Sequence, residues 1–192
     1  DDFISKNDIA RPTTIAIIPV RATKIKGELL ALTKLGDQSL LDIKIQTALH
    51  SDLIKKVVVT SDEKIIEDHI SANYSKEDRV LFVSRPSEMA RYNVSLNDTI
   101  NLILQDPRVS SKLRQALMIL PIEYPFLKTE DIDDAVNTLA IFQADSVLSV
   151  RIERSTFYQH HGDGMVPILG QDKFTKLERE ALYKGVGGIT LC

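Results

Sequence analysis

Short apolar runs alternate along the chain with segments in which hydrophobic positions recur at helical spacing. The apolar runs have no polar face, which is typical of strands buried on both sides of a parallel sheet. They fall at residues 13–20, 55–60, 79–84, 115–121 and 144–151. Helical spacing is found at residues 40–51, 62–70, 100–106 and 129–142. This alternation predicts βαβ units and one mostly parallel sheet covered by helices on both faces.

Acidic residues mark where two of these helices begin. Asp62 precedes one helix and is expected to cap it, because a carboxylate accepts hydrogen bonds from the free amides of the first turn. The helix over residues 129–142 lacks a full capping box but carries Asp131, Asp133 and Asp134 near its start. These three acids are of the type that binds metal, but we favour a surface role in which they complement the helix dipole.

The alternation weakens over residues 152–183, where we expect a β-hairpin or an arm that contacts another subunit. Residues 160–164, HHGDG, predict a turn, and residues 173–184 have a partly helical pattern. His160 and His161 are metal-ligating types, yet adjacent histidines in a glycine-flanked turn rarely converge on one ion. A surface turn is therefore the preferred interpretation.

The composition is that of a globular protein. The chain has 192 residues, of which 43% are hydrophobic, and no repeat or linker interrupts it. We therefore predict one domain over residues 1–192 with a leading arm at residues 1–12. The 24 Lys and Arg residues nearly balance the 27 Asp and Glu residues, for a formal net charge of −3. This balance argues against nucleic acid as the partner.

The cysteine and hydropathy patterns indicate a cytoplasmic protein. Cys192 is the single cysteine, so no intramolecular disulfide forms, and no base lies near it in sequence to make it a nucleophile. No basic segment followed by an apolar stretch opens the chain, and no apolar run is long enough to span a membrane, so we expect no membrane partner. The chain ends inside the apolar run GGITLC, which we interpret as truncation or divergence.

The loop after the first apolar run concentrates positive charge. In open α/β sheets, ligands bind beyond the carboxyl ends of the strands. This loop carries Arg21, Lys24 and Lys26, with Gly27 for a tight turn and Lys34 further on. Several cations and main-chain amides close together suit a triphosphate. The spacing matches neither a P-loop nor a GxGxxG dinucleotide motif, and the charge alone fits a solvated basic loop equally well.

A series of short motifs follows one order along residues 14–191. They are IAIIPVR, KKVVVTSDEKIIE, VSRPSEMA, YPFLKTEDIDDAV, ADSVLSV and LYKGVGGITL. In this order they resemble the segments of the acylneuraminate cytidylyltransferases, the CMP-sialic acid synthetase type of cytidylyltransferase. Each motif is short, and the resemblance rests on their colinear order.

This resemblance implies the nucleotide-diphospho-sugar transferase fold, a Rossmann-like three-layer α/β sandwich that works as a homodimer. It implies attack of a sugar-acid hydroxyl on the α-phosphate of CTP, with release of pyrophosphate and help from Mg²⁺. The catalytic residues implied are Arg21 and Lys24. The nucleotide-binding residues implied are Arg21, Ala22, Lys26, Lys34, Arg85 and Ser95.

Several positions depart from the family pattern. The family motif G-S-K-G becomes TKIK at residues 23–26, and its K-N pair falls on Leu30 and Ala31, so the expected phosphate lysine is absent there. Our hypothesis is that Lys24, Lys26 or Lys34 substitutes for it, because a flexible ammonium tolerates relocation.

The acceptor and metal positions also differ. The family segment L-Q-P-T-S-P becomes LPIEYP at residues 120–125, where Glu123 is expected to repel an acidic sugar. An expected asparagine is Val186, and the aspartates that would bind the metal are expected beyond Cys192, so the metal ligands are unassigned.

Two alternatives to an active acylneuraminate enzyme follow. One is a catalytically silent domain of the same fold that binds a nucleotide or a protein partner. The other is a related nucleotidyltransferase with another nucleotide or acceptor, for which Glu123 and Tyr124 reshape the acceptor pocket. For Arg85, ligand binding and a surface ion pair are equally supported, whereas Arg21 is favoured as functional in every case.

Overall fold

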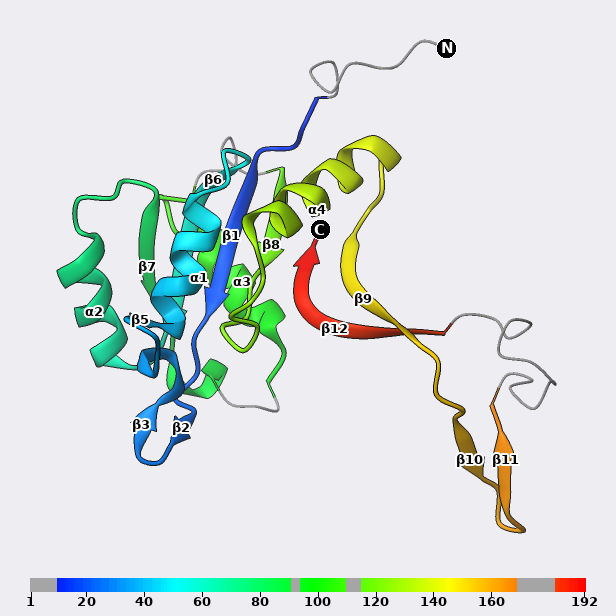
Figure 1. Cartoon of the computed structure of the whole chain (residues 1–192). Coiled ribbons are helices and arrows are strands. Elements are labelled where there is room, and N and C mark those ends of the chain that lie inside the picture. The colour runs from blue at the N-terminus through cyan, green and yellow to red at the C-terminus, as the bar shows by residue number, and fades with distance from the viewer. Residues whose placement is uncertain (1–9, 91–93, 110–114, 169–181) are drawn as a thin grey trace. The chain divides into compact units, whose positions relative to one another are not determined.

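The computed structural model in Figure 1 describes residues 10–90, 94–109, 115–168 and 182–192. Within this part of the chain, the contacts divide into two compact units. One unit comprises residues 1–148 and 188–192, and the other comprises residues 149–187. The expectation of a single domain stays a prediction.

The described residues form a central sheet of six strands in the order β7-β6-β1-β8-β12-β9. The strands are β1 (Thr14–Pro19), β6 (Ile54–Ser61), β7 (Val80–Ser84), β8 (Ala116–Ile119), β9 (Val147–Glu153) and β12 (Leu182–Leu191). β1 pairs in parallel with β6 and β8, and β6 pairs in parallel with β7. β12 runs antiparallel to β8. The predicted mostly parallel sheet is confirmed.

The predicted helices are also present. They are α1 (Leu40–Leu49), α2 (Lys64–Tyr74), α3 (Leu96–Gln105) and α4 (Thr129–Phe142). At the start of α4, the Asp131 side chain accepts a hydrogen bond of 2.8 Å from the Lys128 amide. This acid therefore serves the helix end, as the sequence analysis preferred.

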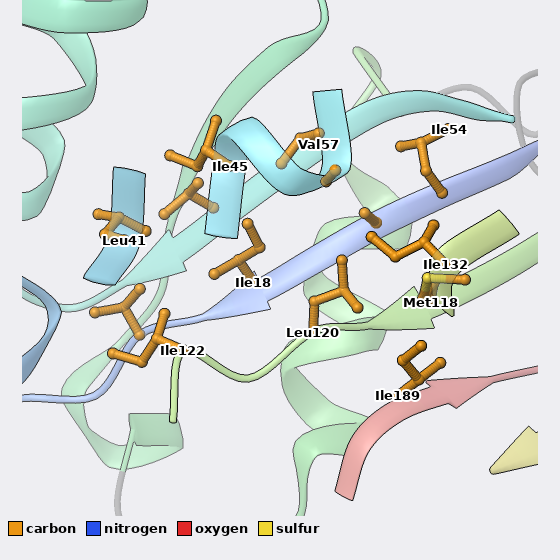
Figure 2. Packing of buried hydrophobic residues seen from close by; sticks show 14 of the residues in the cluster. Ile18, Leu41, Ile45, Ile54, Val57, Met118, Leu120, Ile122, Ile132 and Ile189 are labelled. Carbon is orange, nitrogen blue, oxygen red and sulfur yellow. The ribbon is translucent and has the colours of Figure 1, made fainter. Parts of the chain in front are cut away.

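Both faces of the sheet are buried, and β1 shows this most clearly. Ile17 belongs to the hydrophobic cluster that contains Ile103 of α3. Its neighbour Ile18 belongs to a second cluster with Ile45 of α1 and Ile132 of α4, shown in Figure 2. Successive residues of a strand point to opposite faces, so helices cover both faces of the sheet. The result is the expected α/β fold of three layers.

The segment after β1 differs from the expected long loop. It forms two small hairpins, β2 (Lys24–Ile25) with β3 (Glu28–Leu29) and β4 (Lys34–Leu35) with β5 (Gln38–Ser39), joined by the 3₁₀ helix η1 (Leu30–Leu32). The turns need left-handed backbone, which Gly27 supplies at φ +88° and Gly36 at φ +70°. The turn at Gly27 was predicted from the sequence, but the hairpins were not, because strands of two residues carry no periodic signal.

The expected capping role of Asp62 is wrong. The residue at the helix cap is Glu63, whose amide donates to the Ser61 hydroxyl at 3.2 Å. Asp62 precedes this cap, and one of its carboxylate oxygens is buried. Asp62 directly follows β6 and therefore lies at the carboxyl end of that strand.

The second unit contains the predicted hairpin. It consists of β10 (Tyr158–His160) and β11 (Met165–Pro167), paired antiparallel around the HHGDG turn. Gly162 and Gly164 have positive φ angles of +44° and +148°, which explains the two glycines in this turn. The partly helical pattern expected over residues 173–184 lies mostly outside the described residues, as do residues 1–9 of the predicted leading arm.

Candidate nucleotide site at the carboxyl edge of the sheet

The strand order locates the edge where a ligand is expected. From β1 the chain continues to β6 and β7 on one side, and it then returns to place β8 on the other side of β1. The order therefore reverses between β1 and β8. Doubly wound sheets bind their ligands at such a switch point, beyond the carboxyl ends of the strands. The segments that follow β1 and β8 border this edge, and those that follow β6 and β7 lie next along it.

A buried arginine connects these segments. Arg85, directly after β7, is only 3% exposed, and its Nη2 donates to the Val20 carbonyl at 2.7 Å. Its own amide donates to the Ser61 carbonyl at 3.1 Å. Arg85 thereby links the ends of β1, β6 and β7, and the interpretation of a surface ion pair is wrong because the side chain is not on the surface.

Charged groups converge around this guanidinium. Burial lowers the pKa of Arg85, the nearby Asp62 carboxylate opposes that effect, and the positive charge of Arg21 adds to it. Arg85 Nε, a donor, and Asp62 Oδ1, an acceptor, are both buried and have no hydrogen-bond partner within the part of the chain that the structure describes. The structure therefore brings Arg21, Asp62 and Arg85 together in one polar cluster at the switch-point edge.

The lysines of the first loop lie further out. Lys24, in β2, lines a pocket of about 590 Å³ together with Glu28, Leu29, Glu63 and Ile65, among others. This pocket lies between the first hairpin and the start of α2. Lys24 therefore lies in the wall of this pocket.

Three other candidates of the first loop are exposed. Lys26 lies in the turn of the first hairpin, where its φ of +52° is unusual for a residue with a side chain. Lys34 starts the second hairpin, and Ala22 lies between Arg21 and β2.

Ser95 caps α3. Its Oγ accepts a hydrogen bond of 3.2 Å from the Asn97 amide, and the residue is exposed. An N-cap serine stabilises its helix in this way whether or not a ligand is present. The role of Ser95 in holding a nucleotide stays a prediction, and residues 91–93 before it lie outside the described part.

Sequence reasoning missed Lys44 of α1. Its side chain is fully buried, and its Nζ donates to the Tyr124 carbonyl in the segment after β8 at 2.7 Å. Burial lowers the pKa of Lys44 to about 8, and the carboxylates of Glu123 and Asp131 oppose this shift. The signal was present in the sequence, because Lys44 falls on the apolar face that Leu41 and Ala48 define.

Metal ligands remain unassigned. Among the described residues, no group of three or more His, Cys, Asp or Glu side chains is arranged to hold an ion. The expected Mg²⁺ therefore stays a prediction without assigned ligands, and we derive no step through a metal. No helix in this part of the chain is long and apolar enough to cross a membrane.

Fold and site together define a class. A mostly parallel α/β sheet with a cationic cluster at its switch point has the architecture of a nucleotidyltransferase-like protein. Residues 15–158 match the family described as Cytidylyltransferase, and the chain belongs to this family. A search of curated proteins gave no match.

Solved structures share the fold at low sequence identity. One is 4-diphosphocytidyl-2C-methyl-D-erythritol synthase from Anaerococcus prevotii, with a TM-score of 0.62 and 15% identity over 93% of this chain and 70% of that chain. Another is a CMP:2-keto-3-deoxy-manno-octonic acid synthetase complexed with CTP, with a TM-score of 0.65 and 14% identity over 93% of this chain and 73% of that chain.

Proposed function

We propose that this cytidylyltransferase transfers CMP from CTP to an acidic sugar of the acylneuraminate type. The acceptor hydroxyl oxygen attacks the α-phosphorus, the bond between that phosphorus and the oxygen bridging to the β-phosphate breaks, and pyrophosphate leaves with the bonding electron pair. The hydroxyl proton passes to solvent. The observation that carries the proposal is the buried Arg85, which holds the Val20 carbonyl and with it the start of the Arg21 segment at the switch-point edge.

Residues of the first loop contact the triphosphate in this proposal. Arg21 contacts the triphosphate, where a guanidinium offers two parallel donors to phosphate oxygens. Lys24 adds a second cation from the pocket wall, and the exposed side chains of Lys26 and Lys34 add further positive charge from their hairpins. Main-chain groups at Ala22 approach the phosphates without steric hindrance from a large side chain. In such transfers the protein mainly positions the reactants and neutralises phosphate charge.

We also propose that the chain works as a homodimer through its second unit. Side chains of the hairpin are exposed although they are apolar, with Tyr158 at 54%, Met165 at 61% and Val166 at 49%. Within β9, the alternate residues Leu148, Val150 and Ile152 are each at least half exposed. Exposed apolar surface of this kind marks an association site more often than a free surface. A cytoplasmic location remains part of this proposal.

The silent-domain alternative has one specific observation in its favour. The positions where the family lysine and asparagine are expected hold Leu30 and Ala31, and Ala31 is fully buried in the core. Leu30 is apolar and packs against the same core, so neither of these two side chains supplies a hydrogen-bond donor to a phosphate. The alternative predicts nucleotide binding without turnover.

Calorimetric titration separates binding from its absence. CTP is titrated into the wild-type chain with Mg²⁺, ATP serves as the nucleotide control, and both titrations are repeated with Arg21→Ala. We expect binding of CTP and not of ATP, weakened about tenfold or more in the variant because a charged hydrogen bond to phosphate is lost. Equal binding of both nucleotides, or CTP binding that ignores the substitution, contradicts the assignment of Arg21.

A further inference from the structure

The segment between β8 and α4 consists of two consecutive turns. The first has Ile122 and Glu123 at its centre, and the second has Pro125 and Phe126 at its centre. The second turn is closed by a hydrogen bond of 3.2 Å from the Leu127 amide to the Tyr124 carbonyl. This segment, residues 121–128, is called the β8 loop below. It follows the strand that lies beside β1 at the switch point.

The buried side chain of Lys44 holds the β8 loop by a hydrogen bond to its main chain. Its Nζ donates to the Tyr124 carbonyl, the same oxygen that closes the second turn. The Lys44 side chain has no exposed surface, whereas Glu123 and Phe126 are exposed, the latter at 83%. The anchored turn therefore has a buried cation on one side and ligand-accessible side chains on the other.

Packing alone does not explain a lysine at this position. A buried ammonium is unfavourable unless it is paired, and a methionine fills a similar volume in a helix without that penalty. The α1 helix and the start of α4 are already joined by the Thr129 hydroxyl, which donates to the Thr47 carbonyl at 3.0 Å. The additional contact from Lys44 thus acts on the loop rather than on the pairing of the two helices.

The charge also matters for an acidic acceptor. Glu123 places a carboxylate on the exposed side of the loop, and the Lys44 ammonium interacts electrostatically with it from below. At the low effective dielectric of a protein edge, such a charge offsets part of the repulsion between Glu123 and an approaching anion. The Lys44 ammonium thereby reduces the electrostatic repulsion between the β8 loop and an acidic sugar.

We propose that Lys44 is a positioning residue for the acceptor, acting by fixing the β8 loop at the switch-point edge, next to the segment that follows β1. This inference rests on the proposed function. Lys44 lies outside the motifs on which the family resemblance rests. Its side chain contacts a main-chain carbonyl of the β8 loop. Lys44 touches neither substrate itself.

Lys44→Met tests the proposal, with Thr129→Val as the matched control. Both substitutions remove one hydrogen bond between α1 and the segment from β8 to α4, but only the first releases the Tyr124 carbonyl. For Lys44→Met we expect hydrogen exchange at the Leu127 amide to accelerate about tenfold, and the KM for an acylneuraminate to rise about tenfold. The CTP Kd and kcat are expected to stay within about twofold, and Thr129→Val is expected to leave the acceptor KM unchanged. If Lys44→Met does not fold, Lys44→Gln tests the same loss of charge with an amide donor retained.

Two results overturn the proposal. One is an unchanged acceptor KM with unchanged exchange at Leu127 in the Lys44 variant. The other is a loss of CTP affinity in parallel with acceptor affinity, which indicates general loosening. A wild-type chain that binds CTP but releases no pyrophosphate refutes the proposed function and the acceptor role together, while exchange at Leu127 still reports whether Lys44 anchors the loop.

Discussion

Replacement of Arg85 by methionine removes the link between three strand ends. The Val20 carbonyl loses a donor at 2.7 Å, and the buried oxygen of Asp62 loses the nearby positive charge. A hydrogen bond from a charged group contributes about 1.5–3 kcal/mol, and the uncompensated carboxylate adds to that loss. We expect Arg85→Met to lower the free energy of unfolding by about 2–4 kcal/mol. Urea denaturation followed by circular dichroism measures this change.

The functional part of the same prediction needs a control variant that loses at least as much stability away from the proposed site. Arg79 lies just before β7, at the opposite end of that strand from Arg85, and its guanidinium donates to the carbonyls of Leu49, Ser51 and Ile54. Arg79→Met removes three hydrogen bonds from a guanidinium and is therefore expected to destabilise the fold by at least as much, at the amino edge of the sheet. We expect the CTP Kd to rise about tenfold in Arg85→Met and to change less than about twofold in Arg79→Met.

Comparison of the two variants separates a role of Arg85 in CTP binding from a general loss of stability. If Arg85→Met binds CTP as the wild type does, the arginine is structural only and the switch-point edge is not the triphosphate site. If both variants weaken CTP binding equally, the effect follows from lost stability and not from the position of Arg85. Either result refutes the reasoning that places the nucleotide at this edge.

Two further predictions concern pH. Burial raises the pKa of Asp42, but hydrogen bonds from Ser39, His69 and Tyr74 together lower it below its ordinary value. The stabilising contribution of the Asp42 carboxylate is therefore present above its unfolded pKa and is lost as the pH falls through its lower folded pKa. We expect Asp42→Asn to lower the free energy of unfolding by about 1–2 kcal/mol at neutral pH and to weaken the fall of the urea midpoint at acidic pH. An unchanged fall of the urea midpoint at acidic pH contradicts this prediction. Lys44 has a folded pKa of about 8 against an ordinary 10.5, so the unfolded chain binds more protons in this window and stability should rise between about pH 8 and 10. The rise should be absent in Lys44→Met, and a rise that persists in the variant assigns it to another group.

The sheet and its helices were predictable because their signal is local. A strand that is buried on both faces has a run of consecutive apolar residues in its sequence. Both β1 and β6 contain such a run. The α4 helix follows the same logic, and its bounds, Thr129–Phe142, agree with the predicted range. Boundaries of this kind depend on residues within one or two turns of each other.

The site was less predictable because its contacts join distant segments. Arg85 reaches Val20 across 65 positions of sequence, and Lys44 reaches Tyr124 across 80. No periodicity encodes such pairs, so burial of Arg85 and the anchoring role of Lys44 emerge only from the fold. Most of the candidates chosen from the sequence lie in the loop that begins at Arg21, and of these the structure leaves Lys26 and Lys34 exposed on hairpins.

The central claim is tested most directly by pyrophosphate release from CTP in the presence of an acylneuraminate and Mg²⁺, with 2-keto-3-deoxy-manno-octonic acid as a second acceptor. The account predicts release that requires both CTP and an acidic sugar, that yields the CMP derivative of that sugar, and that is lost in Arg21→Ala. A chain that binds CTP yet releases no pyrophosphate with either acid contradicts the account and identifies a catalytically silent member of the family.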